Sequence, residues 1–332
     1  MATIADVAAR AGVSGSTVSH TLNGTRFVAP ALQARVLAAV SELGYRHNAL
    51  ARSLRTGKSE LLALVIPDLT NPYYPEVARG VQDAADDRGY AVVIYSSDRR
   101  LDREQRFLLK ADERQFDGVV FDPADASPQI LSTLAQLRLP MVLVGSRIDS
   151  PAYDRVLVGP RGAYEPVRHL LAAGHRRIGL IGGPPSVHGR PAKATGYIAA
   201  LGDAGIAPDP AMMVDADYTR EGGARAMQVL LGRTSASGGH LTAVFAANDL
   251  MAIGALDVLH AAGIRVPEEM AVAGYDDIPQ AAFTSPPLTT VAVPKYEIGR
   301  RAVGLLLERM QDPDLPPRRV ELANQLIVRA SA

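Results

Sequence analysis

Residues 14–23 carry small polar side chains at the spacing of one helix face. If Ser14 caps a helix here, Val18 and Leu22 face inward. The outward positions are then Gly15, Ser16, Ser19, His20 and Asn23. Short hydroxyl, amide and imidazole groups can come close to the edges of nucleic-acid bases and hydrogen-bond to them. The segment is therefore a candidate for base recognition, because a merely solvated face would suit lysine and glutamate better.

Two further helices are expected on either side of this segment. Thr3 can cap a helix over residues 4–11, and Asp6, three residues later, completes a capping box. Gly12 begins a tight turn, and a third helix is expected over about 31–43. Two short helices joined by a glycine-containing turn are typical of a helix-turn-helix, whose second helix enters the major groove. An ordinary three-helix bundle used for packing is the alternative.

The charge of the chain is unevenly distributed. The 332 residues have no net formal charge, with 35 basic and 35 acidic residues, yet residues 1–58 contain seven Lys or Arg and two acids. The remainder is therefore acidic. A basic N-terminal segment on an acidic body is typical of a DNA-binding head attached to a sensor domain.

From about residue 60, apolar runs alternate with amphipathic helical segments. Runs such as LLALVI, GVVF and MVLV each end at a turn, and several helices end at a glycine before the next run. Continuous apolar strands between helices predict parallel sheets covered on both faces, and the number of strands favours two lobes. Ligands of such sheets bind beyond the carboxyl ends of the strands, so a binding site is expected in the turns there.

Polar and aromatic side chains gather in those turns. They are Asp68, Asn71, Tyr73 and Tyr74 after the first strand, and Arg147, Arg190, Tyr218, Asn248 and Asp276 after later ones. Carboxylates and amides can pair with sugar hydroxyls, and aromatic rings can pack on the apolar face of a sugar. Asp249 follows Asn248 in one of these turns, and two explanations suit it equally well: it contacts a ligand, or it is simply the N-cap of its helix.

Other functional classes find no support in the sequence. The absence of cysteine excludes disulfides and thiolate metal sites, and no metal site or cofactor is expected. No GxGxxG, Walker A, HExxH or GxSxG motif is present, so an enzyme is not expected. No stretch reaches the ~18 apolar residues needed to span a bilayer, and the N-terminus lacks the apolar core of a signal peptide. A cytoplasmic protein without membrane contact is expected.

The runs TIADVAARAGVSGSTVSHTLNG and LGYRHNALARSLRTGKS resemble the head and hinge of the LacI/GalR family of transcription regulators, most closely its purine-repressor branch. The resemblance extends over essentially the whole chain. It implies major-groove base contacts for Gly15, Ser16 and His20. It implies contacts to the DNA backbone for Thr3, Ser14, Thr17, Asn23, Arg26, Tyr45 and Asn48. Relatives usually have a larger side chain at Gly15, which leaves Ser16 and His20 as the principal base-reading residues.

The hinge of this family corresponds to residues 48–55. Alone, the segment is too short to be a stable helix in water, and in the family it folds when two copies meet over the minor groove. The resemblance implies minor-groove contacts for Ala51, Leu54 and Arg55, with Leu54 as a wedge in the central base step. A linker residue that packs on the body is the alternative for Leu54.

In the body, the resemblance implies that the turn residues form an effector site, to which Lys193 also belongs. Lys193 stands where the family usually has arginine, and lysine keeps the charge but loses the bidentate geometry. A common Asp-Asn pair is replaced by Gly159 and Pro160. Arg147, Arg190 and Lys193 together suggest an anionic ligand such as a sugar acid or sugar phosphate. The alternative is that these three side chains are ordinary charges on the solvent-exposed surface and bind no ligand.

The predicted organisation is an all-α helix-turn-helix head at 1–47, a hinge helix and linker at 48–59, and an α/β body at 60–332. The body resembles periplasmic binding proteins and is expected to have two doubly wound parallel-sheet lobes. The first lobe is expected over about 60–160 and 292–319, and the second over about 161–291 and 320–332.

The expected function is a homodimeric repressor that binds palindromic operator DNA under the control of a small effector, a sugar or sugar derivative. No leucine heptads follow the body, which favours a dimer over a tetramer. A regulator that requires a purine-type corepressor remains an alternative. A solute-binding receptor of the same body fold is a further alternative, although it predicts a signal sequence and no basic head.

Overall fold

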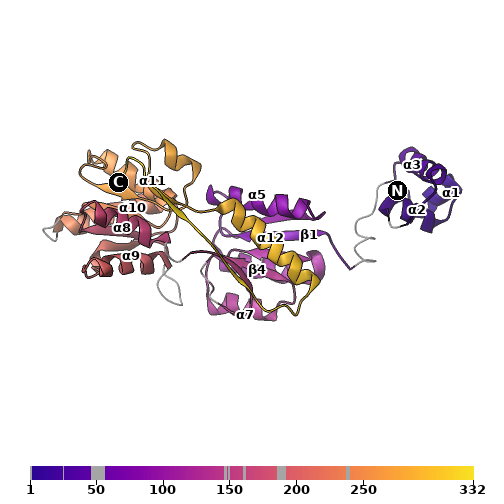
Figure 1. Cartoon of the computed structure of the whole chain (residues 1–332), viewed down its shortest axis with the longest axis horizontal. Helices are drawn as coiled ribbons and strands as arrows, with labels where there is room; N and C mark the ends of the chain where they lie inside the picture. Colours follow the sequence, from indigo (N-terminus) through magenta and orange to yellow (C-terminus); the bar gives the residue numbers. More distant parts are fainter. Residues whose placement is uncertain are drawn as a thin grey trace. The chain divides into compact units, whose positions relative to one another are not determined.

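The computed structural model describes residues 2–24, 26–45, 57–145, 148, 150–159, 162–184, 192–236 and 240–332. The chain divides into two compact units, Met1–Ser59 and Glu60–Ala332. The first unit is called the head and the second the body (Figure 1).

The described part of the head contains the three expected helices. They are α1 (Ile4–Ala11), α2 (Gly15–Asn23) and α3 (Pro30–Leu43). The capping box of α1 is confirmed, because the Asp6 N–H donates to Thr3 Oγ1 at 3.3 Å and the Thr3 N–H donates to Asp6 Oδ2 at 2.8 Å. Helix α3 begins one residue earlier than expected, at Pro30, because proline lacks the N–H that the first helical turn leaves unpaired.

A small apolar cluster holds the three helices together. Its buried members are Val7, Ala8, Ala11, Val18, Val36 and Ala39. Leu22, Leu43 and Tyr45 pack against this cluster while partly exposed. All three helices contribute, so α2 is fixed by its apolar side and its polar side stays at the surface.

The first sheet of the body is parallel, with the strand order β11-β5-β4-β3-β1-β2. Its strands are β1 (Leu61–Ile66), β2 (Ala91–Ser96), β3 (Gly118–Phe121), β4 (Met141–Val144), β5 (Asp154–Val158) and β11 (Arg319–Leu322). Alternate residues of β1 pack on opposite faces, with Leu62 and Leu64 in one apolar cluster and Ala63 and Val65 in another. The lobe built on this sheet is called the N-terminal lobe.

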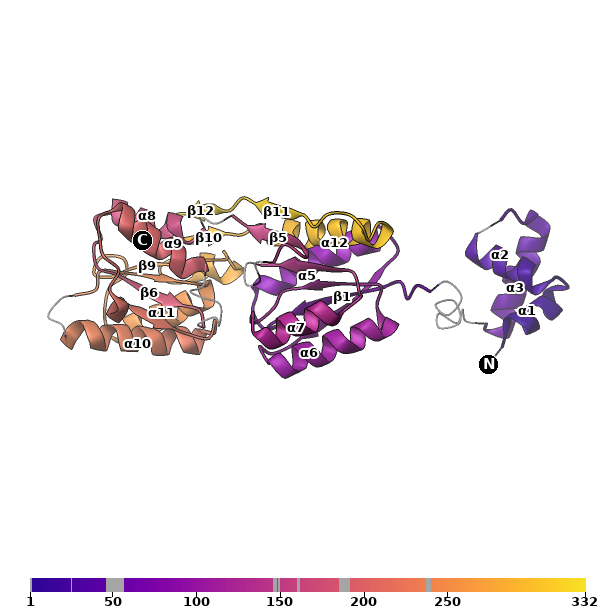
Figure 2. The same cartoon turned by 90° about the horizontal axis from the view of Figure 1, so that it is seen from below.

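Helices cover both faces of this sheet (Figure 2). On one face lie α5 (Tyr73–Asp86) and α12 (Lys295–Gln311), and on the other lie α6 (Leu101–Lys110), the π-helical turn η1 (Ala111–Gln115) and α7 (Pro128–Gln136). The expected parallel sheet with helices on both faces is confirmed.

Helices α5 and α12 come together closely at two glycines. A Cβ on Gly80 would lie 2.0 Å from the carbonyl oxygen of Tyr296. A Cβ on Gly299 would lie 2.2 Å from the carbonyl oxygen of Val77. Two backbones can approach this closely only where there is no side chain between them. The glycines therefore hold α12, which comes late in the sequence, against α5, which comes early (Figure 1).

The second sheet is also parallel, with the order β7-β6-β8-β9, and forms the C-terminal lobe. Its strands are β6 (Ile178–Gly182), β7 (Met213–Asp215), β8 (Ala243–Ala246) and β9 (Ala271–Ala273). Its helices are α8 (Tyr164–Ala172), α9 (Ala192–Asp203), α10 (Arg220–Ala236) and α11 (Asp249–Ala261), with short 3-10 turns η3 (Pro210–Met212) and η4 (Pro279–Phe283). Helices α8 and α9 cover one face, and α10 and α11 the other (Figure 2).

The chain passes between the lobes after β5, between β10 (Thr290–Ala292) and α12, and between β11 and β12 (Gln325–Ile327). Strands β10 and β12 pair antiparallel in a small separate sheet. The expected boundary between residues 319 and 320 falls inside β11, which pairs with β5 of the N-terminal lobe. Residues 320–322 therefore belong to the first lobe, and the segment was missed because β11 has weak apolar character.

Within the described residues, no helix is both long enough and apolar enough to cross a membrane.

Candidate nucleic-acid interface and ligand site

Helix α2 presents its small residues as the sequence predicts. Gly15 and Ser16 are exposed, and His20 is partly exposed, whereas Val18 is fully buried. Ser14 is the N-cap and its Oγ accepts from the Thr17 N–H at 3.2 Å. The hydroxyls of Ser14 and Ser16 also lie within hydrogen-bond distance, at 2.7 Å. The first turn of α2 is therefore held by its own side chains.

The turn between α1 and α2 is fixed from α3. Gly12 has a φ of 62°, in the left-handed region that glycine adopts without steric cost. The Arg35 guanidinium donates to the carbonyl of Ala11 at 2.5 Å, where the helix would otherwise leave a carbonyl without a partner. This contact ties the end of α1 to α3.

The packing of the head does not require glycine at position 15. A Cβ on Gly15 would lie 3.5 Å from Ile4 Cγ2, which is ordinary van der Waals contact. The residue is also exposed and has no left-handed backbone. The fold of the head therefore has room for a side chain at this position.

The residues expected to contact the DNA backbone lie in different settings. Thr3 and Ser14 act as helix caps, Arg26 is exposed, and Tyr45 packs on the head core. The side chain of Asn23 and the residues Asn48, Ala51, Leu54 and Arg55 lie outside the described part of the chain.

In the body, the loop after β1 is closed by two of the expected ligand residues. Asp68 Oδ1 accepts from the Thr70 N–H at 2.9 Å. Asn71, which is buried, accepts from the Tyr73 N–H at 3.0 Å. Both polar groups thus shape the loop that begins α5, and Tyr73 and Tyr74 are placed by it.

The two tyrosines lie at the carboxyl edge of the first sheet. Their rings are perpendicular, with centroids 5.0 Å apart. The buried Tyr74 hydroxyl donates to Asp122 Oδ2 at 3.0 Å, and Asp122 directly follows β3. Burial, and then the charges of Asp122 and Asp276, raise the pKa of the Tyr73 hydroxyl well above its usual value. Since Asp276 belongs to the other lobe, Tyr73 lies where the two lobes meet.

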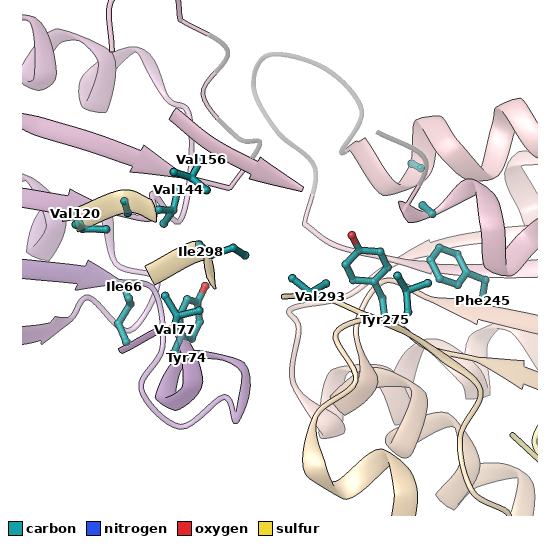
Figure 3. Packing of buried hydrophobic residues seen from close by; sticks show 14 of the residues in the cluster. Ile66, Tyr74, Val77, Val120, Val144, Val156, Phe245, Tyr275, Val293 and Ile298 are labelled. Atoms are coloured by element: carbon teal, nitrogen blue, oxygen red, sulfur yellow. The ribbon is translucent and has the colours of Figure 1, made fainter. Parts of the chain in front are cut away.

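On the C-terminal lobe, a lysine, a tyrosine and an aspartate come together. Lys193 Nζ lies 3.8 Å from Asp276 Oδ1 and 3.8 Å from the centroid of the Tyr275 ring. It also donates to the carbonyl of Ala247 at 2.5 Å. Burial raises the pKa of Asp276, against the opposing effect of the lysine charges. Figure 3 shows Tyr275 beside Phe245 on this lobe, with Tyr74 and Val77 on the other.

Lys295 is a buried support that the sequence pattern did not indicate. Its ammonium donates to the carbonyls of Asp276 and Asp277 at 2.7 and 3.1 Å and lies 3.4 Å from Glu76 Oε2. Asp276 and Asp277 have positive φ values of 109° and 49°, which non-glycine residues rarely adopt. The lysine stabilises this conformation and connects it to α5.

The N-cap of α11 is Asn248 rather than Asp249. Asn248 Oδ1 accepts from the Met251 N–H at 2.9 Å, and its Nδ2 donates to the carbonyl of Tyr218 at 3.1 Å. The capping interpretation of Asp249 was therefore wrong. Asp249 is fully buried, and burial, with repulsion from Asp276, raises its pKa to about 8.

Tyr218 faces both lobes. A Cβ on Gly183, just after β6, would lie 1.9 Å from the Tyr218 hydroxyl, so the glycine leaves room for this side chain. The guanidinium carbon of Arg99, from the loop after β2, lies 4.9 Å from the centre of the Tyr218 ring. Arg99 was not predicted as a site residue because the contact depends on how the lobes pack.

The structure thus brings Tyr73, Tyr74, Lys193, Tyr218 and Asp276 to the facing edges of the two sheets, where it adds Arg99, Asp122, Tyr275 and Lys295. Arg147 and Arg190 lie outside the described residues. No cluster of His, Cys, Asp and Glu suited to a metal ion occurs among the residues described. Carboxylates, lysines and aromatic rings are groups that can bind a polar ring compound.

Two family models match the chain. Bacterial regulatory proteins of the lacI family match residues 3–48, and a periplasmic binding protein-like domain matches residues 167–332. The chain is 34% identical to the HTH-type transcriptional repressor PurR of Photobacterium profundum, over all of this chain and 98% of that protein. The chain belongs to the LacI family. This LacI-family chain is also 36% identical to the ribose operon repressor of Escherichia coli, over the full length of both.

Solved structures of LacI-family regulators agree with this assignment. The transcriptional regulator CelR in complex with cellobiose is 32% identical, with a TM-score of 0.76 over all of both chains. The lac repressor dimer bound to operator and the anti-inducer ONPF, at 24% identity, has the same fold with a TM-score of 0.86. The chain is a DNA-binding transcriptional repressor with a ligand-binding body, and not an enzyme. The predicted fold class is confirmed, and so is the predicted role as a DNA-binding repressor with a ligand-binding body.

Proposed function

We propose that the chain is a homodimeric repressor whose affinity for a palindromic operator depends on a polar, hydroxyl-rich effector bound where the two lobes face each other. One observation carries the proposal. The guanidinium carbon of Arg99, on one lobe, lies 4.9 Å from the centre of the Tyr218 ring on the other, so one small ligand can contact residues of both lobes. An effector held by both lobes would favour one arrangement of the lobes over another.

The chemistry of these residues favours a sugar or a sugar derivative. Carboxylate oxygens of Asp122 and Asp276 can accept from ligand hydroxyls, and the rings of Tyr73, Tyr218 and Tyr275 offer flat apolar surfaces. The same rings could stack on a purine, so a corepressor of that class is the second candidate. Two of the relatives, a ribose operon repressor and a regulator in complex with cellobiose, support the sugar class by name, whereas those named PurR do not.

An effector changes operator binding only by binding the two states of the repressor with different affinity. Typical coupling between two such sites changes affinity by about 5- to 150-fold. An effector that favours the non-binding state acts as an inducer, and one that favours the binding state acts as a corepressor.

The test is a titration of the full-length protein against DNA from upstream of its own gene, followed by fluorescence anisotropy. Ribose, cellobiose and hypoxanthine are added as probes at saturating concentration. We expect at least one probe to change the operator affinity about tenfold or more, and D276N to lose this response while retaining operator binding. If none of the three probes alters operator affinity, or if D276N responds as the wild type does, the assigned site is wrong.

For the head, we propose that Gly15, Ser16 and His20 face the bases and that Leu54 opens the central base step. L54A should weaken operator binding at least about tenfold and leave effector affinity unchanged, since a lost wedge removes the bend that brings more protein onto the DNA. An unchanged operator affinity of L54A in a mobility-shift titration would show that Leu54 is only a linker residue.

A further inference from the structure

Arg99 differs from the arginines that surround it. It lies in the loop between β2 and α6, and in that segment Arg100 and Arg106 pair with Asp102 while Arg103 pairs with Asp98. No carboxylate of the described residues lies within ion-pair distance of the Arg99 guanidinium. Its positive charge is therefore not balanced by the described part of the fold.

The backbone places Arg99 at the carboxyl edge of the first sheet. Its N–H donates to the carbonyl of Pro67, just after β1, at 2.9 Å. Its φ is 58°, a left-handed conformation that costs free energy for a residue with a side chain. From this position the Arg99 guanidinium lies over the ring of Tyr218, which belongs to the other lobe.

The guanidinium stacks on Tyr218 but keeps hydrogen-bonding capacity. Its Nε–H is buried and has no hydrogen-bond partner among the described residues. A guanidinium above an aromatic ring contacts the ring with its flat face. The N–H groups of the guanidinium point outward in its own plane and stay available to an acceptor. An acceptor that approached in this plane would satisfy the buried donor.

The two lysines that the structure describes at the site are already matched by acids. Lys193 pairs with Asp276, and Lys295 pairs with Glu76. The sequence had suggested Lys193 as part of an anion site, but its ion pair with Asp276 and its contact with Tyr275 account for its charge. Arg99 is the better candidate, because it has both an uncompensated charge and an unpaired donor.

We propose that Arg99 binds an oxyanion of the effector, a carboxylate or a phosphate on a hydroxyl-rich skeleton. The inference rests on the proposed effector site and narrows its ligand class. A guanidinium matches two oxygens of such a group in one plane, which an ammonium cannot do. The hydroxyls of the same ligand would lie toward Asp122 and Asp276. One end of the site would then bind the anionic group, and the other would accept hydrogen bonds from the hydroxyls.

The test compares neutral and anionic forms of the same skeleton by calorimetry on the full-length protein. The probes are glucose, gluconate and glucose 6-phosphate, ribose and ribose 5-phosphate, and inorganic phosphate. The variants are R99Q, R99K and, as a matched control from the same loop, R100Q. Arg100 is exposed and paired with Asp102, so its loss changes the net charge equally without touching the site.

We expect the wild type and R100Q to bind at least one anionic probe at least about tenfold more tightly than its neutral partner, equivalent to about 1.4 kcal/mol. R99Q should lose this preference, with its affinity for the neutral partner changed less than threefold. R99K should retain only part of the preference, because it keeps the charge without the planar pair of donors.

The proposal is overturned if no anionic probe is preferred by the wild type, or if R99Q keeps the preference. Arg99 would then only stack on Tyr218. Operator binding of the same samples separates this failure from failure of the proposed function. Neutral probes that still alter operator affinity would leave the proposed function standing, whereas a repressor that responds to no probe would refute both.

Discussion

Replacing Asp249 by asparagine is expected to remove a pH dependence from the stability of the C-terminal lobe. The carboxyl is fully buried, accepts from the Ile278 N–H at 2.9 Å and from the Thr290 hydroxyl at 2.5 Å, and lies near Asp276 and Asp277. Burial, together with the charge of Asp276, raises its pKa from 3.8 to about 8. The folded chain therefore holds a proton on Asp249 that the unfolded chain has released at neutral pH.

The sign and the size of the effect follow from this difference in bound protons. Where the folded state binds more protons than the unfolded state, stability falls as the pH rises. The protonated carboxyl stabilises the fold fully below the unfolded pKa of 3.8, and this stabilisation is lost progressively up to about pH 8. Each pH unit within that window costs about 1.4 kcal/mol, so the free energy of unfolding should fall by about 3 kcal/mol between pH 5 and 7.

The assay is urea denaturation of the wild type and D249N at several pH values, followed by circular dichroism. Asparagine has nearly the same shape, keeps one acceptor and cannot ionise, so its stability should change less with pH. Because all other titrating groups are shared, the difference between the two proteins isolates Asp249. From pH 5 to 7, the free energy of unfolding of D249N should rise by about 3 kcal/mol relative to that of the wild type. Parallel pH profiles would refute the argument and show that the carboxyl is ionised when folded.

Three further predictions follow from packing, buried charge and the recognition helix. G80A should destabilise the body by about 1–3 kcal/mol in urea denaturation, because α5 and α12 leave no room for a Cβ. The control is G232A, because Gly232 lies on an exposed stretch of α10 with open space around it. G232A should be neutral or stabilising by about 0.5–1 kcal/mol. D154N should lower the free energy of unfolding by about 3 kcal/mol or more, because Arg309 and Arg318 lose the buried carboxylate with which they pair. A decrease below about 1 kcal/mol would contradict this. G15A should not lower the melting temperature by more than about 2 °C, because the added methyl meets only ordinary contact. Operator affinity should change at least threefold in a gel-shift titration, and an unfolded G15A would refute the packing argument.

Local signals in the sequence predicted the head well. The capping box of Thr3 and Asp6, the left-handed Gly12 and the inward Val18 depend on residues only a few positions apart, and the structure has each of them. The alternation of apolar runs and helices likewise predicted both parallel sheets. Strand β11 was missed because it lies at a sheet edge with alternating charged residues.

The ligand site was predictable only in part. Turns at the carboxyl ends of strands pointed to Tyr73, Tyr74 and Asp276, since the topology of parallel sheets brings such turns together. Arg99 and Lys295 depend on contacts between segments far apart in the chain, and no local pattern encodes those. Asn248 and Asp249 are adjacent and both suited to capping, so the sequence alone did not decide between them.

The N-terminal lobe is assembled from two distant segments, and this affects how the chain folds as it leaves the ribosome. Strands β1 to β5 are synthesised early, but one face of their sheet lacks α12 and its edge lacks β11 until residues 295–322 have emerged. Throughout synthesis of the C-terminal lobe, the nascent chain exposes apolar surface beside an unpaired strand edge. Such intermediates aggregate readily, so a holding chaperone has a long period in which to act. The head can meanwhile fold on its own contacts, which means that an interrupted chain would carry a finished head on an unfinished body.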